Sequence, residues 1–355
     1  MANPILVEVT RGPLVESVHR GAIAIADASG ALRFALGDVE TPTYPRSSLK
    51  PVQALPLVES GAADAFGLSD EEIALACASH SGEPMHATRV AAWLARIGCS
   101  ERDLACGAHP PRDEPTWEAM IRAGAAPTRL HNNCSGKHAG FLTLARHWNI
   151  ATGGYERIDH PVQQAVASAL SELSGAHDLS WGVDGCAAPN FALALSAFAR
   201  ALAKFADPSA LASPRKESAS RIVRAMIAHP ELVSGTGRAC AILMRACDGV
   251  AVKTGAEGFY AAIIPRLGLG IALKIDDGAG RAAETAIAAL LDNLGFWATT
   301  KTPAQSFARL LPTHAAQSSA SGGPHPHSPM QQSSSRLSLR QRPSCRLFPS
   351  QAYRR

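Results

Sequence analysis

The sequence lacks the patterns that would assign it to several large classes of protein. It contains no uninterrupted run of eighteen apolar residues, so we expect no transmembrane helix and no membrane partner. Glu8 and Arg11 interrupt the N-terminal apolar stretch, which argues against a secretory signal peptide and favours the cytoplasm. No G-x-x-x-x-G-K pattern is present, and Gly235-Thr236-Gly237 is too short to be a nucleotide-binding loop.

The chain also lacks paired cysteines, and one segment of it lacks acidic residues. Its eight cysteines include no C-x-x-C pair, so we interpret them as reduced thiols rather than a disulfide framework. Residues 313–355 hold six arginines and no lysine, aspartate or glutamate, whereas the rest of the chain has a net charge of −2. That near-neutral body has no basic footprint for nucleic acid.

Residues 313–355 are also rich in Ser, Pro and Gln and show no apolar period. We interpret them as a disordered, low-complexity basic tail. Two alternatives remain open, namely a basic arm that binds an acidic partner and an out-of-frame extension that replaces the natural C-terminus.

The remaining 312 residues have the composition of a globular protein with a large core, since 46% of the chain is apolar. Strand-like runs occur early and late, and helical periodicity dominates residues 47–235. We therefore predict one interleaved α/β domain over 1–312. Its mostly antiparallel sheet would combine strands from 1–46 and 249–276, with the helical middle packed beside it.

The first chemical signal is Tyr44-Pro-Arg-Ser-Ser-Leu-Lys-Pro51, which places Ser47-x-x-Lys50 at the start of a helix. Residues three apart share a helix face, so the Lys50 amine could accept the proton of the Ser47 hydroxyl. The plain alternative is that Ser47 is an N-cap and Lys50 is solvated. Ser-x-x-Lys early and Lys253-Thr-Gly late is, however, the pairing used by penicillin-recognising serine hydrolases.

Two cysteine-containing segments form the second signal. Cys134 and Lys137 are again three apart at a helix start, and Cys186 follows Gly182-Val-Asp184-Gly. A lysine near thiolates could lower their pKa, or the cysteines could bind a soft metal. Buried structural cysteines are the third possibility, and spacing alone does not favour zinc.

Together, five segments resemble the rhizobial-type, thermolabile L-asparaginases, a family related in fold to serine beta-lactamases and glutaminases. The matching segments are YPRSSLKP at 44–51, ASHSGEP at 78–84, HNNCSGKHAG at 131–140, VDGCAAPN at 183–190 and VKTGAEGFY at 252–260. The resemblance implies a beta-lactamase-like fold, hydrolysis of L-asparagine to L-aspartate and ammonia, and a homodimer. An altered C-terminal segment is the one departure from the family.

The resemblance also implies site residues. The catalytic pairs would be Ser47 with Lys50 and Ser79 with Lys253. Ser47 is the expected nucleophile, although the sequence does not decide which serine attacks. Further implied groups are a zinc ion bound by Cys134, Lys137 and Cys186, and substrate-binding roles for Arg46, Asp184 and His138, the last of which could instead support a metal ligand. Alternative functions are a beta-lactamase, a penicillin-binding-like or glutaminase-type hydrolase, or a non-enzymatic metal-sensing or RNA-associated protein that uses the basic tail.

Overall fold

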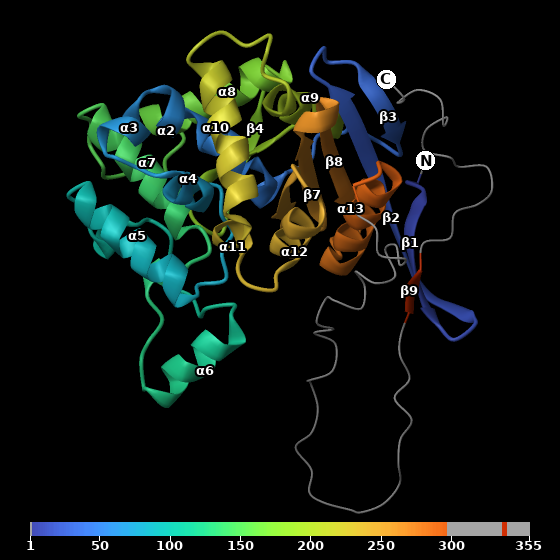
Figure 1. Ribbon diagram of the computed structural model, residues 1–355, viewed down its shortest axis with the longest axis horizontal. Helices are drawn as coiled ribbons and strands as arrows, with labels where there is room; N and C mark the ends of the chain where they lie inside the picture. Colours follow the sequence, from blue (N-terminus) through green and yellow to red (C-terminus); the bar gives the residue numbers. More distant parts are fainter. Residues whose placement is uncertain (1, 297–335, 339–355) are drawn as a thin grey trace, which may run out of the picture.

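An antiparallel sheet built from both ends of the chain organises the computed structural model, which describes residues 2–296 and 336–338 (Figure 1). Its strand order is β6-β7-β8-β2-β1-β9, and β3 pairs with β2 beyond this path. The strands are β1 Ile5–Arg11, β2 Leu14–Asp27, β3 Leu32–Leu36, β6 Ala251–Gly255, β7 Phe259–Ile264, β8 Leu269–Ile275 and β9 Arg336–Ser338. The structure confirms the predicted mixed α/β fold with early and late strands in one mostly antiparallel sheet.

The long strand β2 joins the two halves of this sheet. Its second half, from Gly21 to Asp27, pairs with β8, while its first half pairs with β1. Residues 14–20 of the first half are mostly exposed and polar and carry no continuous apolar run, so their sequence gives little indication of a strand. The predicted tail at 313–355 lies outside the described residues except for β9, which pairs with β1.

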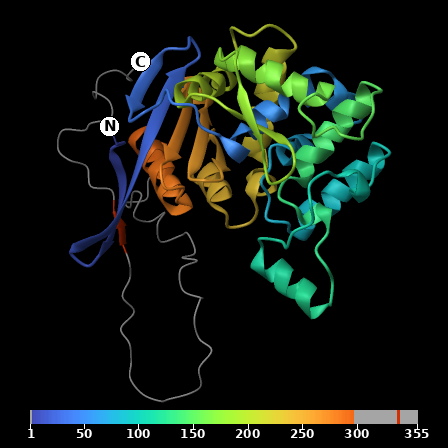
Figure 2. The same ribbon diagram turned by 180° about the vertical axis from the view of Figure 1, so that it is seen from behind.

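Thirteen α-helices in the described residues make up most of the middle of the chain, and most of them lie beside the sheet (Figure 2). They are α1 Lys50–Gln53, α2 Leu55–Glu59, α3 Ala62–Ala65, α4 Asp70–Ala76, α5 Pro84–Arg96, α6 Glu114–Arg122, α7 Ser135–His147, α8 Pro161–Ser174, α9 Leu195–Ala206, α10 Arg215–Ala228, α11 Pro230–Ser234, α12 Ala239–Ala246 and α13 Gly280–Asn293. A short hairpin, β4 Ser180–Val183 with β5 Pro189–Ala192, interrupts the helical middle. This hairpin was not predicted, because strands of only four residues are too short to show a clear apolar pattern.

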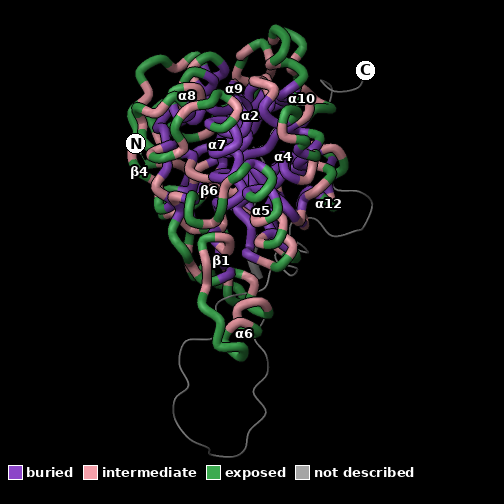
Figure 3. The backbone as a smooth tube through the Cα atoms, turned by 90° about the vertical axis from the view of Figure 1, so that its left-hand side faces the viewer, coloured by how far each residue is buried: buried purple, intermediate pink, exposed green. Residues whose placement is uncertain are grey.

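The exposure of individual elements varies widely (Figure 3). Every residue of β7 is buried, and so are eleven consecutive residues of α7. By contrast, α6 projects from the body and none of its residues is buried. None of the helices in the described chain has both the length and the apolarity that a membrane crossing requires.

Helix α9 packs against β2, β7 and β8, and this contact depends on Gly270 in β8. A Cβ at this position would overlap with the carbonyl oxygen of Ala199 and the amide nitrogen of Ala203. The helix backbone therefore approaches the sheet as closely as it does because no side chain stands between them.

We expect Gly270→Ala to lower the free energy of unfolding by about 2–3 kcal/mol, since overpacking against helix backbone forces α9 away from the sheet. Urea denaturation would measure this loss. The matched variant Gly153→Ala, at an exposed position where a Cβ meets nothing within 4 Å, should change stability by less than about 0.5 kcal/mol. Equal effects of the two variants would contradict the close approach.

Candidate active site

The Ser-x-x-Lys segment forms a 3₁₀ turn, Arg46–Leu49, that leads directly into α1. Pro51 occupies the first turn of α1, where its missing N–H costs no helical hydrogen bond. Lys50 begins α1 with its side chain turned inward, and only 1% of the residue is exposed. The segment thus places a lysine amine inside the protein at a helix start.

Ser79 lies in the loop between α4 and α5. Helix α4 starts at a capping box, in which the Ser69 hydroxyl and the Glu72 carboxylate bond each other's backbone N–H groups. The chain then leaves the helix, and the Ser79 N–H donates to the carbonyl of Val233 at 2.9 Å. Ser79 itself is only 9% exposed. A short loop held by backbone hydrogen bonds therefore fixes this hydroxyl.

Two lysine amines converge on the Ser79 hydroxyl. Lys50 Nζ lies 3.0 Å from Ser79 Oγ, and Lys253 Nζ, which projects from β6, lies 2.8 Å from the same atom. Lys253 also donates to the carbonyl of Thr254 at 2.9 Å. The three groups come from residues up to 203 positions apart, so only the fold brings them together.

Ser47 lines the same cavity but is not in this cluster. Lys50 donates to the carbonyl of Ala78, to Ser79 Oγ and to Cys134 Sγ at 3.1 Å, and an ammonium has only three N–H donors. Among the described residues, the Ser47 side chain has no hydrogen bond. The structure therefore forms the Ser79–Lys253 contact and directs Lys50 to Ser79 instead of Ser47.

Burial favours the neutral form of both lysines. It lowers the pKa of Lys253 to about 7, and the positive charge of Lys50 adds to the effect. Burial also lowers the pKa of Lys50, with a further contribution from Lys137, although Cys134 opposes the shift. A neutral amine beside a hydroxyl can accept its proton, so Lys253 can act as a base near neutral pH.

The two cysteines of the second signal meet beside this cluster. Cys134 is the N-cap residue of α7, and Cys186 lies between β4 and β5, where its Sγ accepts a hydrogen bond from Lys137 Nζ at 3.0 Å. Hydrogen bonds from Cys134 and Lys137, together with the lysine charge, lower the pKa of Cys186 to about 4 despite burial. The same shared proton, with burial, raises the pKa of Cys134 to about 12.

These three residues therefore present one thiolate, one thiol and one ammonium in a single cluster. No group of three His, Cys, Asp or Glu side chains suited to a metal ion occurs elsewhere in the described part of the chain. The Cys134–Lys137–Cys186 set differs from such a group in that its third donor is a lysine nitrogen. Sulfur and nitrogen donors are those that zinc prefers, and three protein ligands leave one position open. By its donor atoms, this set fits a zinc ion.

Arg46 and Asp184 form an ion pair at the cavity edge, with Arg46 Nη2 2.7 Å from Asp184 Oδ1. This pairing opposes burial and lowers the pKa of Asp184. Arg46 has φ +52°, and Ala187, which follows Cys186, has φ +73°. Both loops therefore hold non-glycine residues in the left-handed region, a strain that accumulates at functional sites.

His138 lies away from the cavity lining. Its ring is fully buried in α7, where Nδ1 bonds the Tyr155 hydroxyl at 2.7 Å. Burial and the neighbouring Lys137 charge lower the pKa of His138 to about 3, so the ring is neutral. The structure thus places His138 behind Lys137 and not in contact with the cavity.

A cavity of about 410 Å³ connects these groups. Ser47, Ser79, Cys134, Asp184 and Cys186 all line it, together with Thr254 and Gly255 of β6. The volume suits a small metabolite. Two candidate serine nucleophiles and a charged rim thus share one small hollow, and the Lys50 and Lys253 amines contact one of these serines, Ser79.

The sequence profile of the L-asparaginase II family matches residues 7–321, which is most of the chain. The protein belongs to the L-asparaginase II family. A comparison with curated proteins found no match.

Solved structures with a similar arrangement of elements are distant from this asparaginase-family chain. The native form of Mglu is 17% identical, with a TM-score of 0.46, and the match covers 86% of this chain and 72% of that chain. A beta-lactamase from Mycobacterium bovis is 14% identical, with a TM-score of 0.42 and coverage of 77% and 93%. A beta-lactamase from Burkholderia ambifaria is 17% identical, with a TM-score of 0.38 and coverage of 79% and 96%. Similarity at this level carries no information on the substrate.

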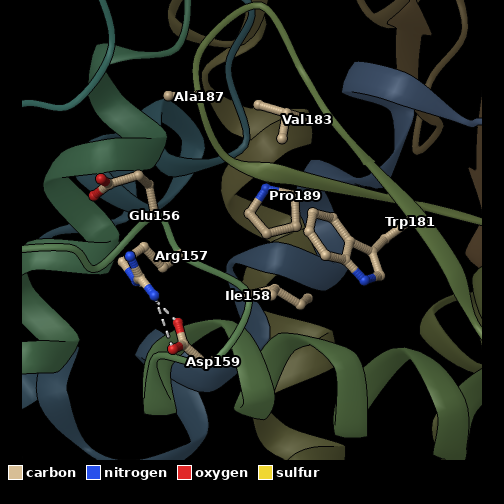
Figure 4. Close-up of a pocket in the computed structure, with 8 residues that line it drawn as sticks. All are labelled: Glu156, Arg157, Ile158, Asp159, Trp181, Val183, Ala187 and Pro189. Carbon is tan, nitrogen blue, oxygen red and sulfur yellow. Dashed lines mark hydrogen bonds and ion pairs between the residues drawn. The ribbon is translucent and has the colours of Figure 1, made fainter.

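A second hollow of about 370 Å³ shares the β4–β5 connection with the asparaginase-family site (Figure 4). Trp181, Ile158 and Pro189 form an apolar floor, and Arg157 and Asp159 at its edge bond each other. Its lining contains no serine, lysine or cysteine. This hollow therefore offers no hydroxyl, thiol or amine nucleophile and is not the candidate active site.

Proposed function

We propose that this protein is an L-asparagine amidohydrolase that releases L-aspartate and ammonia, with Ser79 as its nucleophile. Membership of the L-asparaginase II family supports a hydrolase that acts on amides. The observation that carries the proposal is the placement of the Ser79 hydroxyl between the Lys50 and Lys253 amines in a buried site. A serine hydroxyl needs such a base to become a useful nucleophile.

The proposed reaction begins when neutral Lys253 accepts the Ser79 proton and Ser79 Oγ attacks the side-chain carboxamide carbon. The tetrahedral intermediate collapses when the amide nitrogen takes up a proton from the lysinium and leaves as ammonia. Water then cleaves the resulting aspartyl ester, again with Lys253 as base, and L-aspartate departs. Lys50 holds the Ser79 oxygen in place, and Ser47, which lines the cavity, donates a hydrogen bond to the oxyanion of the intermediate. Asp184, oriented by Arg46, receives the substrate ammonium.

An ammonia-release assay tests the proposal directly. We expect turnover of L-asparagine to exceed turnover of L-glutamine, and nitrocefin to be left intact. Faster turnover of glutamine or nitrocefin would favour the glutaminase-type or beta-lactamase alternative, and absence of ammonia release from any amide would contradict the proposal. A cytoplasmic homodimer without nucleic acid or membrane partners remains our expectation.

We also propose that Cys134, Lys137 and Cys186 bind one zinc ion. Because burial is outweighed by the Cys186 and Cys134 charges, the pKa of Lys137 is raised, so binding must displace its proton. A zinc ion there would add a fixed positive charge beside the cavity. The protein itself holds Lys137 against Cys186 and keeps Lys50 in contact with Cys134.

We expect the purified protein to contain about one equivalent of zinc and Cys134→Ala to retain less than about a tenth of it, because one of three ligands is lost. Elemental analysis by mass spectrometry measures the metal, and circular dichroism checks the fold. Cys99→Ala, a half-buried thiol outside the cavity lining, serves as the control and should keep its zinc. A folded wild-type protein that takes up no zinc would contradict this assignment.

A further inference from the structure

Two arginines in the wall of the active-site cavity have no role in the reaction described above. Arg112 and Arg238 both line the cavity, Arg112 exposed and Arg238 half-buried. Within residues 2–296, neither guanidinium has a hydrogen bond or an ion pair. Arg46 differs, since its guanidinium is already bonded to Asp184. Arginine forks bind carboxylates in a bidentate geometry, so two unpartnered forks in one cavity mark a place for an anion.

The loop that carries Ser79 also positions Arg112. The backbone N–H of Arg112 donates to the carbonyl of Ser81 at 2.7 Å, and that of Asp113 donates to the same oxygen at 3.1 Å. These two hydrogen bonds fix the start of the segment that leads into α6. The backbone of Arg112 is therefore bonded to Ser81, which lies two residues after the proposed nucleophile Ser79.

The same loop holds the turn before Arg238. Thr236 donates to the Glu83 carboxylate from both its backbone N–H, at 2.8 Å, and its hydroxyl, at 2.7 Å. Gly235 has φ +116°, and a Cβ there would overlap with Ser81 Oγ, so only glycine allows the turn to lie against the loop. Arg238 follows as the N-cap residue of α12. The Gly235-Thr236-Gly237 turn thus fixes the backbone position of Arg238.

The charges of this corner are unbalanced. Partial desolvation in the cavity wall lowers the pKa of Arg112, the positive charge of Arg238 lowers it further, and Cys134 opposes the shift. Of the two acids that line the cavity, Asp184 is paired with Arg46, and the other is Glu284, whose pKa burial raises against the pull of Arg238. One carboxylate therefore stands against two guanidiniums, and a bound anion would relieve the excess.

We propose that Arg112 and Arg238 bind the α-carboxylate of the substrate and so restrict the enzyme to free amino acids. This inference rests on the proposed function, in which Ser79 attacks the amide at the other end of the same molecule. Since one loop positions the nucleophile and both arginines, it sets the distance between the reacting carbon and the recognised carboxylate. Asparagine within a peptide or with its α-carboxylate amidated lacks the anion that this corner requires.

The test compares L-asparagine with L-asparaginamide, whose α-carboxylate is replaced by a neutral amide, in the wild-type protein and in Arg112→Gln, Arg238→Gln and Arg238→Lys. We expect each glutamine variant to raise KM for L-asparagine about 10- to 100-fold with kcat within about threefold, because a charge-assisted hydrogen bond is lost. KM for L-asparaginamide, measured from side-chain ammonia, should be high and unchanged, and Arg238→Lys should recover part of the affinity. Arg102→Gln, at an exposed arginine outside this cavity, is the control.

An unchanged KM for L-asparagine in both glutamine variants, or an equal rise for both substrates, would overturn the inference. If the wild-type protein releases no ammonia, the proposed function fails instead, and calorimetric binding of L-aspartate then decides the inference separately. We expect binding to wild type that is weakened about 10-fold or more in Arg238→Gln. Equal binding, or none to wild type, would overturn it.

Discussion

Replacing Ser79 with alanine should lower kcat for ammonia release from L-asparagine by at least about 10³-fold, because it removes the hydroxyl held between two amines. Ser47→Ala should cost less, about 10²-fold, since Ser47 lines the cavity and can bond the oxyanion but touches no base. Steady-state assays on both variants, with the zinc content of each measured, provide the comparison.

The control for these variants is Ser174→Ala, which removes a buried hydroxyl bonded to the Leu170 carbonyl in α8. It should leave kcat within about threefold, since the residue is outside the cavity. If Ser47→Ala were the more damaging of the two cavity variants, the sequence-based assignment of Ser47 as nucleophile would be favoured over Ser79.

Lys253→Met should lower kcat by about 10³-fold, because the proposed base is lost while the side-chain volume is kept. In the wild-type protein, a base whose pKa lies at about 7 is mostly protonated below that pH. We therefore expect kcat/KM to rise with pH up to about 7 and then level off. A pH–rate profile from pH 5 to 9 measures this rise in kcat/KM. The rise should be absent from the residual activity of Lys253→Met.

The same substitution should stabilise the fold. The pKa of Lys253 is about 7 when folded against 10.5 for a free lysine, so the unfolded state binds more protons between these values and wild-type stability rises with pH across that window. Methionine removes this penalty, and we expect a gain on the order of 1–3 kcal/mol at pH 7 that shrinks towards pH 10. Lys216→Met, a surface control, should show neither effect. A destabilised Lys253→Met would contradict the account of a neutral buried amine.

The sheet could be predicted where strands are continuously apolar, as in β7 and β8. The exposed half of β2 could not, because its residues make hydrogen bonds to β1 without burying a face. Neither could the four-residue strands β4 and β5, whose pairing brings Cys186 towards Lys137. Local periodicity reports burial, and elements that are stabilised mainly by backbone pairing give little of that signal.

The candidate site, like the sheet, could be predicted from the sequence only in part. The Ser-x-x-Lys segment does begin a helix, and Ser79 and Lys253 do meet, although 174 residues separate them. The partner of Lys50 could not be inferred from i, i+3 spacing, because the buried amine satisfies its donors with groups from other elements. No sequence pattern marks Arg238, which follows Gly235-Thr236-Gly237, because only the fold brings this side chain to the cavity.

The most direct test of the central claim is to identify the residue that carries the acyl group during turnover. The full-length protein is mixed with L-asparagine, quenched in acid within milliseconds, digested and analysed by peptide mass spectrometry. We predict an aspartyl ester on the peptide that contains Ser79 and none in Ser79→Ala. An ester on Ser47, or undiminished ammonia release by Ser79→Ala, would contradict the account.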